Sequence, residues 1–303
     1  MTILAFDFGG TKLAAAFVET TRGEILHKLT IATPAEKGAD ACLQAMFDLG
    51  ESLIGKFAEK PTAIGISYGG PVTPDQQRCV LSNHIPGWVD YPLVEKTRLH
   101  FNLPVSMDND ANAAALGSWV YDVNREPDHF MYVQASTGIG GGLVLNRHLF
   151  RGGSMAGEIG HTHVPGNPAK CVCGNFGCLE TICAGWGIAE RAAEYLNDGT
   201  NPTAEVVFAS IRSGDAAYTT MIEEAFKAFG VNIANAVAVM DLQQVVFGGG
   251  IFRSQDIIAP VMLAAIEKAT PSYMRGRCSY GFSTLNGIET LLGAALLTQE
   301  EML

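Results

Sequence analysis

Three glycine-rich segments contain residues of this sequence that could bind phosphate. They are Asp7–Lys12, Ser136–Gly142 and Gly248–Gly250, and each directly follows an apolar run. Turns without side chains let backbone N–H groups approach phosphate oxygens, and the hydroxyls of Thr11 and Thr137 add donors. One such turn is typical of an ordinary tight hairpin, because glycine is the usual residue where φ is positive. Three of them, beside the carboxylate that opens the first segment, indicate a nucleotide site.

A second set of residues has the composition of a metal site. His161, Cys171, Cys173 and Cys178 form the pattern H-x9-C-x-C-x4-C. Thiolate and imidazole ligands of this kind form closed tetrahedral zinc sites. We therefore predict structural zinc here, in a compartment that keeps thiols reduced. The remaining cysteines, which we expect to be ordinary buried thiols, are Cys42, Cys79, Cys183 and Cys278.

Asp110 is the candidate catalytic base. A hydroxyl group is a poor nucleophile, and a positioned carboxylate can accept its proton while a phosphoryl group is transferred. The alternative is purely structural, because Asp110 opens an apparent helix and aspartate is a common N-cap residue. For Asp7 we expect a role in ordering Mg²⁺ or its waters, since ATP chemistry needs the metal to neutralise phosphate charge.

The elements that carry these residues read as alternating strands and helices. Apolar runs predict strands over 2–8, 12–18, 25–31, 63–67 and 104–107, and helical spacing of apolar residues predicts a helix over 39–60. An alanine-rich helix follows Asp110 and extends to Trp119. We expect the first lobe to comprise residues 1–118.

A second lobe is predicted over residues 119–303. It begins with a strand over 129–134 and a glycine-rich hairpin that returns through 143–145. A helix over 218–240, a strand over 244–247 and a last helix over about 287–299 follow. We expect the last helix to pack back on the first lobe. No repeat of 20 to 50 residues is visible.

Composition limits the possible partners. The chain has 303 residues, 48% of them hydrophobic and 17% charged, with 34 glycines and a formal net charge of −11. This composition is typical of a compact enzyme. An acidic protein without a basic patch is not expected to bind nucleic acid or an anionic membrane. Without a signal peptide or a long apolar run, we expect a cytoplasmic protein.

The motifs taken together resemble the ROK family (repressor, open reading frame, kinase) of actin-like sugar kinases, from residue 4 to about residue 295. The resemblance implies a two-lobed α/β fold of the actin-like, ribonuclease-H-like type, with the active site in an interdomain cleft. It implies ATP, Mg²⁺ and structural Zn²⁺ as cofactors. The residues that it assigns to the nucleotide are Asp7, Gly9, Gly10, Thr11, Lys12, Ser136, Thr137, Gly138, Gly140, Gly248, Gly249 and Gly250.

The same resemblance assigns the sugar site. It makes Asp110 the catalytic base, and it gives the sugar hydroxyls to Gly70, Asn83, Asn109, Asp110, Glu158, His161 and Glu180. The phosphate turns are expected to lie away from the zinc cluster. Tyr68 stands where many family members have proline, near the expected sugar pocket, and Trp88 is more typical of a core residue than of a stacking platform.

These assignments predict phosphorylation of a hexose, with glucose as the first choice. Kinases of N-acetylmannosamine, N-acetylglucosamine and fructose in the same family are alternatives. A non-catalytic sugar-sensing ROK protein is an alternative of a different class. Sugar-responsive repressors of the family carry a DNA-binding segment before the first turn, and only six residues precede Asp7 here. We expect a homo-oligomer, with a dimer favoured.

Overall fold

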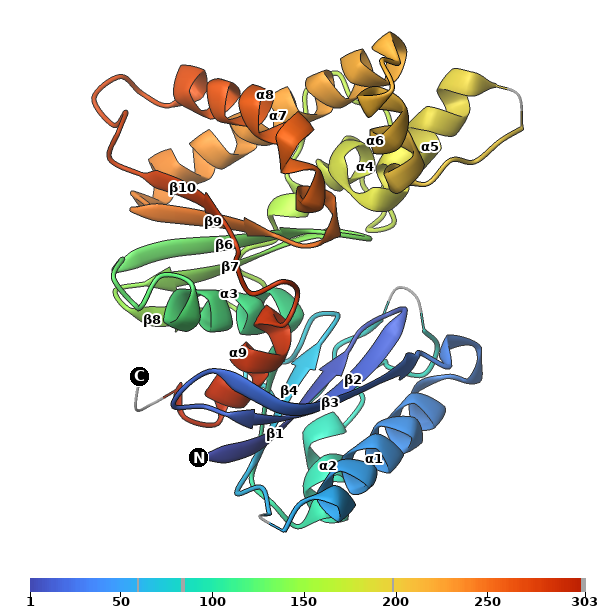
Figure 1. The fold of residues 1–303 in the computed structure, drawn as a ribbon, viewed down its shortest axis with the longest axis vertical. Coiled ribbons are helices and arrows are strands. Elements are labelled where there is room, and N and C mark those ends of the chain that lie inside the picture. Colours follow the sequence, from blue (N-terminus) through green and yellow to red (C-terminus); the bar gives the residue numbers. More distant parts are fainter. Residues whose placement is uncertain (59, 83–84, 198, 301–303) are drawn as a thin grey trace. The chain divides into compact units, whose positions relative to one another are not determined.

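A computed structural model describes residues 1–58, 60–82, 85–197 and 199–300. Two five-stranded sheets, each with helices packed on it, make up the molecule (Figure 1). The chain divides into two compact units: unit 1 comprises Met1–Glu126, Gly142–Gly157 and Ile288–Leu303, and unit 2 comprises Pro127–Gly141 and Glu158–Gly287. The predicted lobe boundary between residues 118 and 119 stays a prediction.

The first sheet has the strand order β3-β2-β1-β4-β5. Its strands are β1 (Thr2–Phe8), β2 (Lys12–Glu19), β3 (Glu24–Ala32), β4 (Ile64–Tyr68) and β5 (Val105–Asn109). Strands β1, β2 and β3 form an antiparallel meander, while β4 and β5 run parallel to β1. The five strands predicted in this part of the sequence are confirmed, with small differences at their ends.

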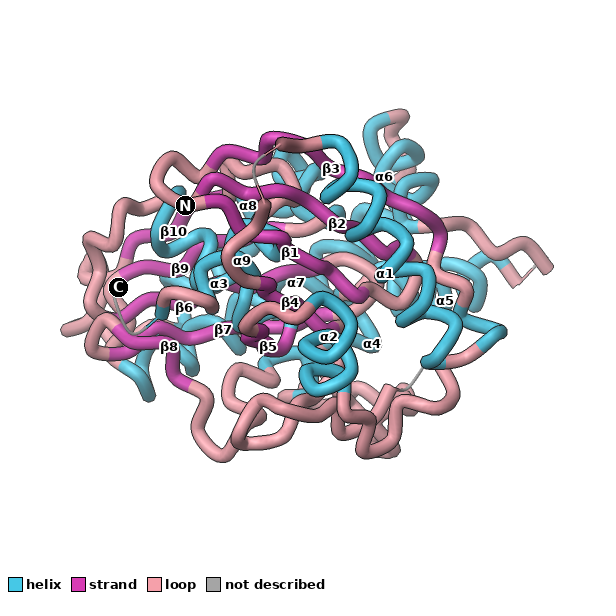
Figure 2. The backbone as a smooth tube through the Cα atoms, turned by 90° about the horizontal axis from the view of Figure 1, so that it is seen from below, coloured by secondary structure: helices cyan, strands magenta, loops and turns pink. Residues whose placement is uncertain are grey.

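Helices cover both faces of this sheet. On one face lie α1 (Ala39–Lys56) and α2 (Leu93–Phe101), which cross the strands in the view of Figure 2, and on the other lies α9 (Glu289–Leu297). Side chains alternate along a strand, so Leu4 and Phe6 join the large apolar core under α1 and α2. The predicted helix over 39–60 is too long, because Phe57 takes an extended conformation. Its ring packs against Phe17 and His27.

The second sheet has the order β10-β9-β6-β7-β8. Its strands are β6 (His129–Ala135), β7 (Ile139–Leu145), β8 (His148–Phe150), β9 (Gln244–Gly248) and β10 (Ser279–Phe282). The glycines of residues 140–142 lie inside β7, so the turn before it is shorter than predicted. Gly142 is needed there because a Cβ atom would stand 2.4 Å from the carbonyl oxygen of Ala111.

The two sheets share one topology. The order β3-β2-β1-β4-β5 maps element by element onto β8-β7-β6-β9-β10. The pairs β2–β3 and β7–β8 are both antiparallel. Strand β4 runs parallel to β1 and β5, and its equivalent β9 runs parallel to β6 and β10. The first two glycine-rich turns therefore stand after equivalent strands, β1 and β6, and the third follows β9, the equivalent of β4.

The remaining helices are α3 (Asp110–Tyr121), α4 (Glu180–Cys183), α5 (Gly185–Leu196), α6 (Ala204–Arg212), α7 (Ala216–Met240) and α8 (Gln255–Ala269). Short 3-10 turns, η1 (Ala35–Lys37), η2 (Ile159–His161) and η3 (Gly250–Ser254), connect other elements. Asp215 is the N-cap of α7, and its carboxylate accepts hydrogen bonds from two N–H groups of the first turn. Within the described ranges, no helix is both long enough and apolar enough to span a bilayer.

Candidate functional site

The first glycine-rich turn joins β1 to β2. The N–H group of Gly9 donates to the carbonyl oxygen of Lys12 at 3.1 Å, which closes a tight hairpin. A Cβ atom at Gly9 would stand 2.8 Å from that oxygen, so the turn requires glycine there. Gly10, Thr11 and Lys12 are exposed at the tip. The turn thus presents backbone groups, the hydroxyl of Thr11 and the side chain of Lys12.

Asp7 lies at the end of β1, directly before this turn. Its carboxylate accepts hydrogen bonds from the hydroxyls of Ser67 at 3.0 Å and Thr290 at 3.3 Å. Burial raises the pKa of Asp7, while these two hydroxyls and Lys28 lower it. Such a carboxylate fits the preference of Mg²⁺ for oxygen ligands. Sequence reasoning did not find Ser67 or Thr290, which are 60 and 283 residues away from Asp7.

The junction between β5 and α3 carries the candidate base. Asn109 is the N-cap of α3, because its side-chain oxygen accepts hydrogen bonds from the N–H groups of Ala111 and Asn112. The capping role that we considered for Asp110 therefore belongs to its neighbour. Asp110 is the first helical residue, and its Oδ1 accepts from Ala111 N–H at 2.9 Å.

Gly70 meets this junction. The side-chain amide of Asn109 donates to the carbonyl oxygen of Gly70 at 3.1 Å, so two predicted sugar-site residues are in contact. At Gly69, a Cβ atom would lie 3.9 Å from Oδ2 of Asp110. The absence of a side chain at Gly69 therefore leaves room beside the candidate base. Asn83, the third predicted contact of this region, lies outside the described residues.

The second and third glycine-rich turns end β6 and β9. Ser136 and Thr137 are exposed, and Gly140 lies within β7. In the third turn, Gly249 has a φ of 92°, and a Cβ atom there would stand 2.4 Å from the carbonyl oxygen of Ala135. The glycine at 249 is therefore required by the backbone itself, and a phosphate-binding or adenosine-binding role for these turns stays a prediction.

The predicted zinc ligands come together. The ligand atoms of His161, Cys171, Cys173 and Cys178 all lie within 4.8 Å of one another. The sulfur atoms of Cys173 and Cys178 are 3.6 Å apart, and Nδ1 of His161 is 3.6 Å from the sulfur of Cys171. Sulfur atoms bound tetrahedrally at about 2.3 Å from zinc are about 3.8 Å apart. The cluster therefore fits structural zinc.

The two predicted sugar carboxylates flank this cluster. Nε2 of His161 lies 3.8 Å from Glu158, and Nδ1 of the same ring lies 3.6 Å from Oε1 of Glu180. Glu180 is 5% exposed, and its Oε1 also accepts from the Cys171 thiol at 2.9 Å. The structure thus brings Glu158, His161 and Glu180 together beside the candidate metal centre.

Glu180 also lies beside the second glycine-rich turn. A Cβ atom at Gly138 would stand 3.4 Å from Oε2 of Glu180. The expectation that the phosphate turns lie away from the zinc cluster is therefore wrong for this turn. The physical reason is that β6 ends next to the junction of α4 and α5, where the carbonyl oxygen of Ser136 accepts from the N–H of Gly185, the first residue of α5, at 2.8 Å.

Tyr68 and Trp88 are core residues. Tyr68 is 3% exposed, its hydroxyl donates to the carbonyl oxygen of Leu81 at 3.0 Å, and its ring packs on Trp88. The Trp88 ring makes edge contacts with Phe8 and Tyr91. The Tyr68 hydroxyl therefore holds the backbone of Leu81 from within the core, and Trp88 is confirmed as part of the core.

Duplicated mixed sheets with this strand order constitute the actin-like ATPase fold, and a His/Cys cluster beside carboxylates is compatible with its sugar kinases. The model of the ROK family matches residues 3–301, so the chain belongs to the ROK family. It is a sugar kinase of that family.

Relatives of known function match along nearly the whole chain. A glucokinase of Halalkalibacterium halodurans is 31% identical, with 97% of this chain and 94% of that protein covered. An N-acetylmannosamine kinase of Shigella flexneri is also 31% identical, and both chains are covered completely. The two relatives are named for different sugars, and both are 31% identical to this chain.

Solved structures agree on the fold. A ROK hexokinase from Thermus thermophilus superimposes with a TM-score of 0.87 at 29% identity, covering 100% of this chain and 99% of that one. A ROK family glucokinase from Streptomyces griseus, in complex with glucose and AMPPNP, gives a TM-score of 0.85 at 25% identity, covering 98% and 99%. The predicted actin-like sugar kinase fold is confirmed.

Proposed function

We propose that this protein transfers the γ-phosphoryl group of ATP to a hexose hydroxyl, with glucose as the first candidate. The observation that carries the proposal is the β5–α3 junction. There Asn109 supplies the helix cap, while Asp110 stands at the first helical position beside Gly69. A carboxylate in that place can accept the proton of a sugar hydroxyl as its oxygen attacks phosphorus.

Other residues have supporting roles in this proposal. Glu158, Glu180 and His161 accept or donate hydrogen bonds to ring hydroxyls, and Asn109 holds a further hydroxyl near the base. The first turn, with Gly9 to Lys12, and the turns at 136–140 and 248–250 bind the nucleotide. Bound Mg²⁺ would neutralise phosphate charge, with Asp7 ordering the ion or its waters. Zinc would hold the loop that carries His161.

N-acetylmannosamine is the second candidate sugar. It is favoured by the relatives of that name, which match the chain as well as the glucokinase does. N-acetylglucosamine and fructose remain alternatives from the family resemblance. A polar group left unpaired in a closed site costs about 1–3 kcal/mol, so the correct sugar should be preferred by roughly 5- to 150-fold for each such group.

We further propose a dimer in the cytoplasm. A reducing compartment suits the thiolate cluster, which an oxidising one would convert to disulfides. Light scattering at several protein concentrations would test the assembly, and a mass equal to that of one 32.2 kDa chain at all of them would contradict the dimer.

Coupled measurement of ADP release tests the activity. The panel consists of glucose, N-acetylmannosamine, N-acetylglucosamine, fructose and mannose. We expect the highest kcat/KM for glucose. A clearly higher value for another sugar would replace glucose as the substrate, whereas no ADP release with any sugar would contradict the kinase proposal and favour the sugar-sensing alternative.

Asp110→Asn tests the catalytic base. The amide keeps the shape and removes the proton acceptor, so kcat should fall by about 10²- to 10⁴-fold while sugar binding survives. The matched control is Asp241→Asn, at an exposed position whose left-handed backbone suits asparagine. Turnover of Asp110→Asn close to that of the control would remove Asp110 from the mechanism.

A further inference from the structure

Asp108, directly before the Asn109-Asp110 pair, is a fully buried carboxylate. Its side chain is 0% exposed. Its Oδ1 accepts from the N–H of Asn109 at 2.7 Å and from the side-chain amide of Asn112 at 2.9 Å. Both donors belong to the junction between β5 and α3. Asp108 therefore holds the segment that carries the candidate base from within the core.

The other oxygen of Asp108 binds Arg151. Nε of Arg151 donates to Oδ2 at 2.6 Å, and this side chain is 20% exposed. Arg151 lies in the segment 142–157 of unit 1, just after β8. Burial raises the pKa of Asp108, and the guanidinium of Arg151 opposes that rise, so Arg151 favours the ionised form that accepts hydrogen bonds at both oxygens.

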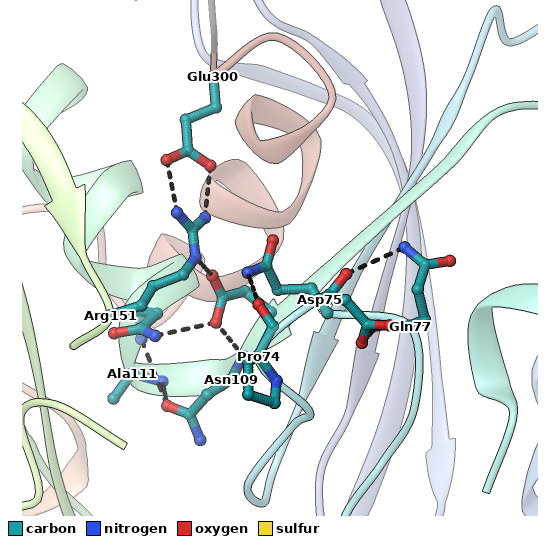
Figure 3. A network of polar contacts seen from close by, with 10 residues as sticks. Pro74, Asp75, Gln77, Asn109, Ala111, Arg151 and Glu300 are labelled. Carbon is teal, nitrogen blue, oxygen red and sulfur yellow. Dashed lines mark hydrogen bonds and ion pairs between the residues drawn. The ribbon is translucent and has the colours of Figure 1, made fainter. Parts of the chain in front are cut away.

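Arg151 is itself fixed by Glu300. Nη1 and Nη2 of Arg151 donate to the two carboxylate oxygens of Glu300 at 2.9 and 2.5 Å, as Figure 3 shows. This paired geometry uses the planar fork of arginine, with Nε left to bind Asp108. Glu300 is 26% exposed and lies near the end of the chain. A single guanidinium thus joins the C-terminal segment to the β5–α3 junction.

Loss of this charge would change the junction. Without Arg151, Oδ2 of Asp108 has lost its donor and a buried carboxylate favours a proton there. Oδ1 of the neutral acid still accepts from Asn109 and Asn112, but these bonds are weaker than those to a carboxylate. The hold of Asp108 on the backbone of Asn109 would therefore weaken, and with it the positioning of Asp110, the next residue. A displacement of about 1 Å at a reacting group can cost on the order of 10²-fold in rate.

We propose that Arg151 and Glu300 are positioning residues for phosphoryl transfer, which act through Asp108 on the Asn109-Asp110 pair. The inference rests on the proposed function, because it needs Asp110 as the base. Neither Arg151 nor Glu300 touches the sugar or nucleotide in this scheme. Their removal should therefore lower kcat more than it raises the KM for ATP.

The test measures kcat, both KM values and the melting temperature for Arg151→Gln, Arg151→Lys and Glu300→Gln. We expect kcat to fall by about 10- to 100-fold in Arg151→Gln and by about 3- to 10-fold in Glu300→Gln, with the KM for ATP changed less than about 3-fold. Arg151→Lys keeps the positive charge but not the forked geometry of the guanidinium. Its kcat should therefore lie between that of Arg151→Gln and that of the wild type.

A double-substitution cycle separates positioning from general stability. If Arg151 acts through Asp108, then Asp108→Asn combined with Arg151→Gln should lower kcat no further than Asp108→Asn alone. The matched control is Arg212→Gln, which breaks a paired contact between Arg212 and Asp256 in unit 2. Its kcat should stay within about 2-fold of the wild type.

Each outcome decides the inference. A folded Arg151→Gln protein with kcat near that of the control overturns the inference. It is also overturned if the fold-loss of kcat in the double variant equals the product of the losses in Asp108→Asn and Arg151→Gln. If Arg151→Gln does not fold, Glu300→Gln decides instead, and unchanged kcat in that variant overturns the inference. Failure of the proposed function looks different, because wild type would then release no ADP or Asp110→Asn would keep full turnover.

Discussion

At the scale of single residues, the carboxylate of Glu180 lies between the metal cluster and the second glycine-rich turn. One carboxylate oxygen faces His161 and Cys171 of the metal cluster, and the other faces the position that a side chain at Gly138 would take. A carboxylate shared in this way couples the metal loop to the second glycine-rich turn. Substitutions at Gly138 therefore cannot be treated as changes to a nucleotide site alone.

Gly138→Val should weaken the binding of both sugar and ATP. The β-branched side chain would occupy the space beside Oε2 of Glu180 as well as the backbone that we assign to phosphate. Gly281→Val is the matched control, in β10, where no atom lies within 4 Å of a new Cβ. Isothermal titration with each ligand measures the effect, and unchanged affinity for both would refute either role.

Asp7 should make the molecule's stability depend on pH. Because burial raises the pKa of Asp7, the folded state disfavours its ionised form, and stability is lost as the pH rises through this raised pKa. Asp7→Asn removes that cost. Its melting temperature should exceed that of the wild type at about pH 8, and the gap should shrink as the pH falls toward 3.8, the ordinary pKa of aspartate.

Thermal melts at the two pH values check this expectation, with exposed Asp241→Asn as the control. Asp7→Asn should also lose most kinase activity, because the amide is a poorer ligand for Mg²⁺ or its waters. A gap that widens as the pH falls would contradict the sign that we assign.

At the scale of elements, α9 packs unusually close to its neighbours. A Cβ atom at Gly293 would stand 1.6 Å from the carbonyl oxygen of Ala113 in α3, and one at Gly65 in β4 would stand 1.8 Å from that of Ala294. Glycine and alanine at these contacts let the backbones approach. This close packing explains how Thr290, in the first turn of α9, reaches Asp7.

Gly293→Ala should therefore destabilise the protein, although alanine favours a helix by about 1 kcal/mol over glycine. The steric conflict with backbone atoms outweighs that gain, because a carbonyl group of a packed helix cannot move aside cheaply. Gly55→Ala in α1 is the control, since nothing lies within 4 Å of its new Cβ, and it should raise the melting temperature. Equal shifts in the two variants would refute the packing argument.

The metal loop should control sugar binding. Cys173→Ser should lower the zinc content and raise the KM for sugar, because the ligands His161 and Cys171 contact Glu180 and fix its carboxylate. Because Glu180 adjoins Gly138, we now expect some loss of ATP affinity too. Elemental analysis and titrations measure these effects.

The control for the metal loop is Cys278→Ser, which changes a buried thiol outside the cluster and should leave zinc in place. A zinc-free Cys173→Ser protein that phosphorylates its sugar at the normal rate would show that the loop does not need the metal.

At the scale of the whole molecule, two sheets repeat one strand order. The first two glycine-rich turns follow the equivalent strands β1 and β6, so the same strand-and-turn arrangement occurs twice along the chain. The sequence shows no repeat, because each sheet has its own side chains, inserted helices and loop lengths. Hydrogen bonds between strands join backbone groups and do not require particular side chains. The duplication is therefore visible in the pairing of strands and not in the sequence.

The sequence by itself determined the local features of this protein. Strands β1 to β6 and β9, helices α1, α3, α7 and α9 and the four clustered cysteine and histidine residues follow from apolar runs, turn residues and ligand spacing, all of which act over short stretches of chain. Helix α2 (Leu93–Phe101) was not predicted. The resemblance of the motifs to the ROK family is confirmed by the family match.

Tertiary structure alone decided which distant residues meet. The hydroxyl of Thr290 binds Asp7, Arg151 joins Asp108 to Glu300, and Glu180 lies beside Gly138. It also decided that Asn109 caps α3 in place of Asp110. Such contacts depend on how sheets and helices pack, and packing is set by the shapes of whole surfaces, which no spacing within one segment encodes.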